Sequence, residues 1–210
     1  MSLLSKIIYR CKCRHIGKHT LIHSSTEMVE AFRISIEGNG EIRQHCIFDA
    51  RSNVPISIEI GENVRIKDSA NLAAYGGYIK IGKNVLIGRN VTIFGHGGVI
   101  IGDNAMLSPN VSIISSNHVC YLDSTKSFQE QGFTREQITI GNNVWIGCNT
   151  VVLAGAHIPN NVIIGAGSIV NKKLKGNSIY AGNPIKFIKH IDTSMPDGIE
   201  VFFKDWGIIK

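Results

Sequence analysis

Large aromatic side chains are scarce in this sequence. Phe, Trp and Tyr make up 7% of the 210 residues, whereas 22 residues are glycine and 43% are hydrophobic. This composition argues against a core built around bulky rings and favours a narrow core filled by Ile, Val and Ala. The length lies within the usual range of a single domain.

Long apolar runs are also missing. No stretch approaches the roughly 20 residues that a membrane-spanning helix needs. The first ten residues make a poor signal peptide, because Lys6 and Arg10 interrupt the apolar stretch and no A-x-A-like cleavage site follows. We therefore expect a cytoplasmic protein in which the five cysteines are reduced thiols.

Acidic residues are absent before Glu27, and the chain carries a formal charge of +6 with a sequence pI of about 9.1. Nucleic-acid binding is not favoured, because no aromatic residues are interleaved with the basic ones and no recognition-helix pattern is present. A small polyanionic ligand better explains the basic cluster near the C-terminus. This cluster consists of Lys172, Lys173, Lys175, Lys186 and Lys189.

A repeat of six residues runs from 140 to 175. Its hexads read IGNNVW, IGCNTV, VLAGAH, IPNNVI, IGAGSI and VNKKLK, and each opens on an aliphatic residue. A period of six matches neither the face of an α-helix nor simple strand alternation. It predicts an all-β fold, a parallel β-helix in which three short strands form one coil and the coils stack. The periodicity alone does not fix the hand of this helix.

Four coils open on the pattern Ile-Gly-x-Asn, at Ile60, Ile81, Ile101 and Ile140. We expect each opening Ile to point inward and to stack on its equivalents at a spacing of roughly 4.8 Å. We expect each Asn to occupy a corner with a left-handed backbone, because Gly and Asn tolerate that conformation best.

The extent of the repeat divides the chain into three regions. Residues 1–32 are expected to form an N-terminal cap, with a basic amphipathic helix near Leu3–Cys13, and residues 33–175 the β-helix. Residues 176–210 are expected to form a C-terminal tail. Caps cover the open ends of a solenoid. The basic N-terminal helix could also make a peripheral membrane contact, although a solvated cap is the simpler interpretation.

One segment interrupts the repeat inside the β-helix. The coil that begins at Ile101 ends at His118, and the register resumes only at 138–140. The intervening segment, 119–137, is too long for a corner and too mixed in composition for a strand. Long excursions from compact folds are usually functional. We therefore expect chemistry at His118, at the mouth of this loop.

These features resemble the hexapeptide-repeat acyltransferases, which fold as a left-handed β-helix. The nearest likeness is to the branch that contains galactoside, maltose and serine O-acetyltransferases and the O-acetyltransferases of bacterial surface polysaccharides. The likeness extends from Ile60 to Ile188, about two thirds of the chain. The matching segments are LSPNVSIISSNH at 107–118, Gln131-Gly132-Phe133, ITIGNNVWIG at 138–147, IGAGSIV at 164–170 and YAGNPIKFI at 180–188.

The resemblance implies an enzyme that moves an acetyl group from acetyl-coenzyme A to a hydroxyl or an amine, with no metal required. It implies a homotrimer with active sites between neighbouring solenoids. It also makes His118 the general base. A sugar hydroxyl is a weak nucleophile at neutral pH, and a neutral imidazole has the right basicity to accept its proton as it attacks the thioester.

The coenzyme site follows from the same resemblance. Cys148 is a modest departure, because the family often has Ser or Ala at this position. The residues expected to line the coenzyme are Trp145 along the pantetheine arm, Gly147, Cys148 and Ala166 beside its amides and thioester, Asn171 and Lys172 beside the nucleotide, and Lys186 and Lys189 near the 3′-phosphate.

Acceptor contacts are expected from the interrupting loop and from one glycine-rich corner. The candidates are His96, Tyr121, Asp123 and Phe133, and Asp123 could also orient His118. The acidic residue that small-sugar acetyltransferases carry in their N-terminal part has no clear match, which argues against simple galactosides or maltose. The long loop favours O-acetylation of a sugar unit destined for a bacterial surface polysaccharide.

Three alternatives remain. An N-acetyltransferase of an amino sugar nucleotide would usually carry an additional nucleotide-binding domain, for which the first 32 residues are short. A carbonic-anhydrase-like metalloprotein would need three histidines on adjacent strands, and His118 has no partner at the required spacing. A non-catalytic scaffold is the third alternative, and the presence of His118, Trp145 and the terminal lysines argues against it.

Overall fold

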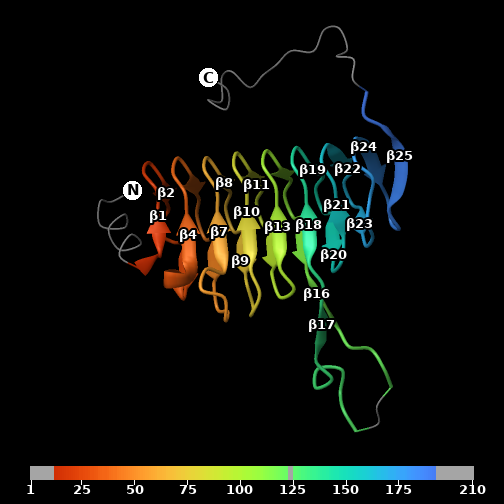
Figure 1. Cartoon of the computed structure of the whole chain (residues 1–210), viewed down its shortest axis with the longest axis horizontal. Helices are drawn as coiled ribbons and strands as arrows, with labels where there is room; N and C mark the ends of the chain where they lie inside the picture. The colour runs from red at the N-terminus through yellow and green to blue at the C-terminus, as the bar shows by residue number, and fades with distance from the viewer. Residues whose placement is uncertain (1–11, 123–124, 193–210) are drawn as a thin grey trace.

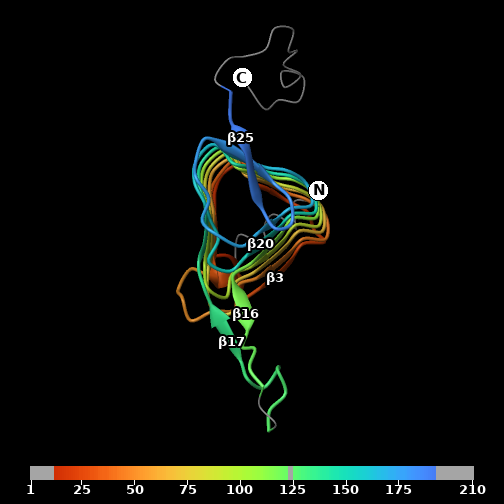
Figure 2. The same ribbon diagram turned by 90° about the vertical axis from the view of Figure 1, so that its right-hand side faces the viewer.

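The structure, a computed structural model, describes residues 12–122 and 125–192. These residues form a parallel β-helix of triangular cross-section, with one short 3₁₀-helix, η1 (Ala31–Arg33). In Figure 2 the C-terminal end faces the viewer, and the chain turns clockwise as it advances toward this end. This is the left-handed sense. The predicted all-β, left-handed fold is confirmed.

Three sheets, here called A, B and C, make the sides of the triangle in the described part of the chain, and their strands run parallel except for the last strand of sheet B. Sheet A contains β1 (His15–Ile16), β4 (Ile34–Ile36), β7 (Ile58–Ile60), β10 (Ile79–Ile81), β13 (Val99–Ile101), β18 (Ile138–Ile140) and β21 (His157–Ile158). Sheet B contains β2 (Leu21–Ile22), β5 (Glu41–Ile42), β8 (Arg65–Ile66), β11 (Leu86–Ile87), β14 (Met106–Leu107), β19 (Trp145–Ile146), β22 (Val162–Ile164), β24 (Ser178–Ala181) and β25 (Lys186–His190). Sheet C contains β3 (Glu27–Val29), β6 (Ile47–Asp49), β9 (Asn71–Ala73), β12 (Thr92–Phe94), β15 (Ser112–Ile114), β20 (Val151–Leu153) and β23 (Ile169–Val170).

The core consists of aliphatic residues stacked in register from coil to coil. In sheet A, Ile58, Ile79, Val99 and Ile138 pair in line, and all four are fully buried. The Ile residues that open the Ile-Gly-x-Asn pattern are also buried and aligned, as predicted. Strands β7, β10, β13 and β18 each bury two aliphatic side chains inside the triangle, and side chains of this size fill it with few rings.

The corners between sheets A and B carry the predicted asparagines in a left-handed conformation. The φ angles are 57° at Asn63, 57° at Asn84, 58° at Asn104 and 53° at Asn143. Their side chains also bond along the stack, with Asn63 Nδ2 donating to Asn84 Oδ1 over 2.9 Å and Asn84 Nδ2 to Asn104 Oδ1 over 3.1 Å. The corner asparagines therefore form the turn and also connect neighbouring coils through a ladder of side-chain hydrogen bonds.

The β-helix begins earlier than the sequence predicts. Strands β1, β2 and β3 already form a complete coil, and β1 pairs with β4 in the register of the later coils. The predicted boundary at residue 33 is therefore wrong: residues 15–32 belong to the β-helix, although their hexads lack the Ile-Gly-x-Asn pattern. The predicted helix near Leu3–Cys13 falls mainly outside the described residues.

The C-terminal end of the β-helix is closed by a strand that reverses direction. After β24 completes sheet B in parallel, β25 adds to it antiparallel. Ile185, in the turn between them, is buried. Part of the predicted tail is therefore a continuation of sheet B. It covers the end of the stack as a cap should.

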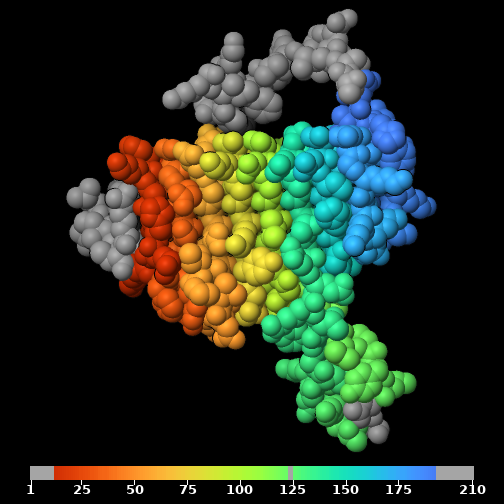
Figure 3. Space-filling view, viewed as in Figure 1, coloured from red at the N-terminus to blue at the C-terminus, as the bar shows by residue number. Residues whose placement is uncertain are grey.

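The interruption after sheet C is a protruding β-hairpin. Its base is made by β16 (Ser116–His118) and β17 (Phe133–Arg135), which pair antiparallel. Figures 1 and 3 show this hairpin projecting from the body at the corner between sheets C and A. The sequence interpretation of 119–137 as irregular is therefore wrong at its C-terminal end, where alternate residues of a strand face opposite sides.

Neither a membrane-spanning helix nor a disulfide is present in the part of the chain that the structure describes. The thiols of Cys13 and Cys46 are buried, and burial raises the pKa of Cys13 to about 11. Burial also raises the pKa of Cys46. Both groups are therefore neutral, poorly reactive thiols.

Candidate active site

The base of the hairpin is fixed by Ser115, a buried residue at the corner between sheets C and A. Its hydroxyl donates to the carbonyl oxygen of Phe94 over 2.8 Å and accepts from the backbone N–H of Gly97 over 3.0 Å. The backbone N–H of Glu136 donates to the carbonyl of Ser115 over 3.1 Å, closing the hairpin. A Cβ at Gly97 would lie 2.6 Å from the nitrogen of Glu136, so only glycine allows this approach.

His118 lies on one face of the hairpin together with residues from the other strand. It is directly opposite Phe133, and Ser116 is opposite Arg135. Because side chains alternate along a strand, these four residues share a face, and Asn117 points to the other side. His118 and Phe133 are both exposed, so this face is open to a ligand.

His96 lies beside this face, within an aromatic cluster. Its ring centroid is 4.9 Å from that of Tyr75 and 5.2 Å from that of Phe133. Its Nδ1 atom is buried and has no hydrogen-bond partner among the described residues. Burial lowers the pKa of His96, and the nearby charges of Arg135 and His118 lower it further. The structure thus brings His96, His118 and Phe133 together, as the acceptor predictions require.

The other two acceptor candidates lie further out on the hairpin. Tyr121 is half exposed, and its backbone N–H donates to Gln131 Oε1 over 3.5 Å. Asp123 lies outside the described residues, so its suggested contact with His118 remains a prediction.

Tyr75 and Arg135 were missed by the sequence interpretation. Arg135 could have been found from its spacing, because it follows Phe133 by two residues and a strand there places both on one face. Tyr75 belongs to a coil corner with no repeat signal, and only the stacking of coils brings it to His96.

Several predicted coenzyme residues lie on the outer face of sheet B. One outward row, here called the sheet B row, runs across paired strands through Met106, Trp145, Ile163, Ile179 and Lys189. Three strand spacings separate Trp145 from Lys189, a distance of about 14 Å. Trp145 is 46% exposed, and its Nε1 donates to Ser108 Oγ over 3.0 Å, which fixes the indole on the surface. An irregularity in β25 also brings Lys186, opposite Ala181, onto this outward face.

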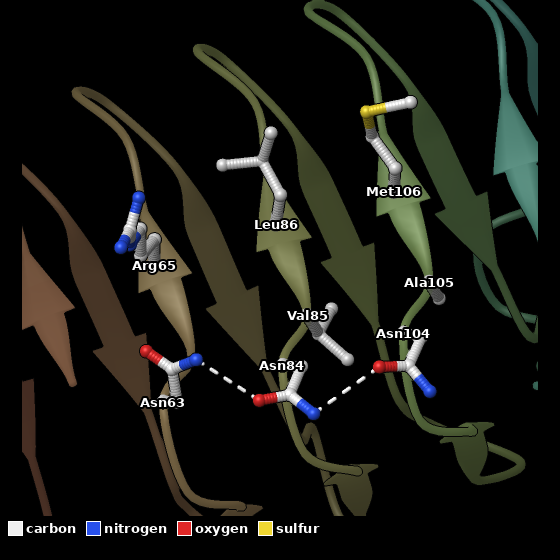
Figure 4. A pocket seen from close by; sticks show the side chains of 8 residues that line it. All are labelled: Asn63, Arg65, Asn84, Val85, Leu86, Asn104, Ala105 and Met106. Atoms are coloured by element: carbon white, nitrogen blue, oxygen red, sulfur yellow. Dashed lines mark hydrogen bonds between the residues drawn. The ribbon is translucent and has the colours of Figure 1, made fainter. Parts of the chain in front are cut away.

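A shallow groove continues the sheet B row toward the N-terminal end. Arg65, Leu86 and Met106 pair across adjacent strands and point outward (Figure 4). The groove runs beside the asparagine ladder. Its exposed apolar side chains make the outer face of sheet B different from that of sheet A, where Lys80 and Glu59 form an ion pair.

Gly147, Cys148 and Ala166 lie together at the corner between sheets B and C. A Cβ at Gly147 would lie 2.6 Å from the backbone nitrogen of Ala166, so glycine is needed for the two coils to approach. The carbonyl of Cys148 accepts from the N–H of Gly167 over 2.8 Å. The Cys148 thiol is half-buried and free. The predicted grouping of these three residues agrees with the geometry.

Asn171 and Lys172 lie apart from these residues, at the corner between sheets C and A in the last coil. Lys172 lines a groove at the end of the β-helix together with Lys173, Lys175 and the rings of Phe187 and His190. Phe187 packs against Tyr180 with ring centroids 5.7 Å apart. The basic cluster of the sequence is therefore split between this groove and the outer face of sheet B.

His118 and Trp145 cannot meet within one chain. The hairpin leaves the corner between sheets C and A, and sheet B is the side of the triangle opposite that corner (Figure 2). The predicted base and the predicted pantetheine contact therefore lie on different sides of the same β-helix.

Among the described residues, no three His, Cys, Asp or Glu side chains form a group that could hold a metal ion. The zinc site of the anhydrase alternative needs three histidines.

Comparison with known proteins identifies the family. Residues 137–172 match the family "Bacterial transferase hexapeptide (six repeats)", and residues 78–115 match "Hexapeptide repeat of succinyl-transferase". Galactoside O-acetyltransferase of Escherichia coli K12 is 36% identical over 149 residues, 71% of this chain and 70% of that protein. The chain belongs to the hexapeptide-repeat acyltransferases.

Other relatives and structures agree with this assignment. Galactoside O-acetyltransferase of Lactococcus lactis is 30% identical over 136 residues, 65% of this chain and 64% of that protein. The structure of AntD, an N-acyltransferase from Bacillus cereus in complex with dTDP and 3-hydroxybutyryl-CoA, has a TM-score of 0.65 at 21% identity. It covers 89% of this chain and 88% of AntD, and it shows the shared fold.

Proposed function

We propose that this protein is an acetyl-CoA-dependent O-acetyltransferase that acts on a sugar hydroxyl, with His118 as the general base. The observation that carries the proposal is the open hairpin face, on which His118 lies beside Phe133 and near His96. The relatives that are named galactoside O-acetyltransferases support an acyl-CoA donor and a sugar acceptor.

The chemistry is a direct transfer. Nε2 or Nδ1 of neutral His118 accepts the proton of the sugar hydroxyl while the oxygen attacks the thioester carbonyl carbon. The resulting tetrahedral intermediate collapses as the carbon–sulfur bond breaks, and the imidazolium returns the proton to the leaving thiolate. The products are the acetyl ester and coenzyme A. No metal or covalent enzyme intermediate is needed in this scheme.

The donor is proposed to lie along the sheet B row. Trp145 and Ile163 offer an apolar surface to the pantetheine arm, with Gly147, Cys148 and Ala166 at the corner beside it. The Lys189 ammonium, about 14 Å further along, and Lys186 attract phosphate as mobile point charges. Asn171 and Lys172 are proposed to contact the nucleotide from the groove at the end of the β-helix.

The separation of His118 and Trp145 supports a homotrimer. Because they lie on opposite sides of one β-helix, a complete site needs the hairpin corner of one copy beside sheet B of the next. The outward apolar side chains of Leu86, Met106 and Trp145 on sheet B suit such a contact, and those of Met106 and Trp145 are exposed. A heterologous contact of this kind forms a ring when the rotation between copies closes, and we propose that three copies close it.

The biological setting is proposed to be the cytoplasmic assembly of a bacterial surface polysaccharide. The length of the hairpin supports a large glycan acceptor rather than a free disaccharide. Peripheral membrane contact through the basic N-terminus would place the enzyme near lipid-linked intermediates, but that segment lies outside the described residues.

A transfer screen tests the catalytic proposal. Release of coenzyme A thiol is followed with sugars, amino sugars, nucleotide sugars and glycan oligomers, and the product bond is identified by mass spectrometry. We expect an acetyl ester, a loss of about 10²–10⁴-fold in kcat for His118→Ala, and no change in Tm. His15→Ala, half exposed on the first coil, is the matched control. Products acetylated only on nitrogen would favour the N-acetyltransferase alternative, and full activity of His118→Ala would identify another base.

Complementation tests the shared site. His118→Ala and Trp145→Ala copies, each weakly active alone, are co-expressed and purified as a mixture. A hybrid trimer restores one intact site, in which His118 of one copy faces Trp145 of another, so activity should return. Failure to recover activity in trimers shown to be mixed would mean that His118 and Trp145 do not act in one shared site.

A further inference from the structure

Arg135 shares the hairpin face with the proposed base. Its strand partner is Ser116, two residues before His118, and it follows Phe133 by two residues on its own strand. Two residues along a strand span about 7 Å. The guanidinium therefore lies on the side from which a sugar would approach His118. Its position is two residues closer to the base of the hairpin than that of His118.

The guanidinium is held by ring and backbone contacts. Its central carbon is 5.1 Å from the centroid of Phe133, in a cation–π arrangement. Its other side covers the corner at Gly76, where φ is +85° and a Cβ would lie 3.6 Å from Nη2 of Arg135. Cation–π contacts leave the edge of the guanidinium, with its N–H donors, free to bind another group.

No acidic residue pairs with Arg135 in the described part of the chain. Arg33 and Arg51, at corners of earlier coils, are each bound by a nearby carboxylate, Glu30 and Asp49. Glu136 does not serve this role, because its Oε2 lies against Gly155 in the following coil. Among the residues that the structure describes, the charge of Arg135 is thus uncompensated beside the site.

An uncompensated arginine next to an aromatic platform is an arrangement for binding a ring with an acidic substituent. The planar fork of a guanidinium donates two parallel hydrogen bonds to a carboxylate or to a phosphate. The exposed rings of Phe133 and Tyr75 offer apolar surface to the sugar itself.

We propose that Arg135 anchors an anionic group of the acceptor, so that this enzyme acetylates an acidic sugar. The anionic group is a carboxylate, as in a uronic acid, or a phosphate, as in a sugar phosphate or nucleotide sugar. This inference rests on the proposed acetyltransferase function and narrows its acceptor class. Arg135 is then a specificity-determining residue, and His118 remains the base.

Galactose derivatives that differ in charge test whether Arg135 binds an anionic group of the acceptor. Initial rates of acetyl transfer are compared for methyl galactopyranoside, methyl galactopyranosiduronate, galactose 1-phosphate and UDP-galactose. We expect Arg135→Gln to lower kcat/KM for at least one anionic acceptor by about 10- to 100-fold, the range for a charge-assisted hydrogen bond. Arg135→Lys should retain part of the rate. Arg14→Gln removes an exposed arginine on the first coil and should change rates by no more than about twofold.

The outcomes separate this inference from the proposed function. Two results would overturn the anchor and leave the acetyltransferase function in place. In the first, the wild type transfers acetyl to the neutral galactoside as fast as to every anionic acceptor. In the second, Arg135→Gln lowers kcat/KM by the same factor for all acceptors. If the wild-type protein transfers to no acceptor, the proposed function fails, and calorimetry of galacturonate and galactose 1-phosphate binding in the presence of coenzyme A decides the anchor. At least tenfold weaker binding by Arg135→Gln would support it, whereas equal binding, or no binding to wild type, would overturn it.

Discussion

The rings of His96 and Phe133 pack edge to face, with centroids 5.2 Å apart and an interplanar angle of 76°. This contact joins a coil corner to the protruding hairpin, two elements separated by 37 residues of sequence. It also shields the imidazole from water while leaving Nδ1 without a hydrogen-bond partner among the described residues. Protonation of His96 should therefore oppose packing of the hairpin against the corner.

The first prediction concerns pH and stability. The pKa of His96 is lowered in the folded state by burial and by the charges of Arg135 and His118. Between this lowered value and the unfolded value of about 6.5, the unfolded chain binds more protons, so stability rises with pH. The contribution of His96 is fully present above pH 6.5 and is lost as the pH falls. His96→Gln should flatten the decrease in Tm between pH 7.5 and pH 5.

A histidine outside the cluster provides the control. His15→Gln removes an imidazole from the first coil, where this ring is half exposed beside Glu37. It should leave the shape of the Tm profile as in the wild type. An unchanged profile in His96→Gln would mean that this histidine is equally easy to protonate in the folded and unfolded chains.

The second prediction concerns the core. Phe48 is fully buried and aligned between Met28 and Leu72 in sheet C. Phe48→Ala should lower the free energy of unfolding by about 3–5 kcal/mol, because the narrow triangle cannot collapse around the cavity. Phe32→Ala, at a ring that is 57% exposed, should cost less than about 1 kcal/mol. Urea denaturation measures both, and similar midpoints for the two variants would contradict the assignment of Phe48 to the core.

The third prediction separates the two roles of a corner asparagine. Asn84 has a φ of 57° and takes part in the amide ladder with Asn63 and Asn104. Asn84→Gly keeps the left-handed corner and loses the ladder, whereas Asn84→Ala loses both. Alanine should therefore be the more destabilising change by about 1 kcal/mol, the cost of a left-handed backbone for a residue with a Cβ. Equal Tm values for the two variants would show that the corner can relax to another turn.

Sequence periodicity predicts the later coils because each position repeats one physical requirement. The opening Ile must fill the triangle, and the corner Asn must accept a positive φ, so both remain visible as a pattern. The first coil is different. Its corner between sheets A and B uses His19 at positive φ in place of asparagine, and the repeat is not visible there although the strands pair in register.

The candidate site is only partly encoded in local sequence. His118 could be found because the hairpin interrupts the repeat, and the family resemblance then supplied its role. The association of His96 with Tyr75 and Phe133 depends on the stacking of coils and on the return strand of the hairpin, which a local pattern does not record. Likewise, Trp145 and Lys189 are 44 residues apart in sequence and become one row only through strand pairing.

The last prediction tests the sheet B row as the path of the donor. Lys186 and Lys189 are exposed on β25, so replacing both with Gln should leave Tm nearly unchanged. The KM for acetyl-CoA should rise, because two positive charges that attract its phosphates are lost. Salt screens such charges, so the KM of the wild type should increase between 0.05 and about 0.3 M NaCl, and that of the double variant should increase less.

Lys12→Gln combined with Lys18→Gln removes two lysines at the opposite end of the β-helix and serves as the charge-matched control. If the two double variants show the same KM and the same salt dependence, the phosphates of the donor bind elsewhere, and the groove lined by Lys172 and Lys173 becomes the place to test next.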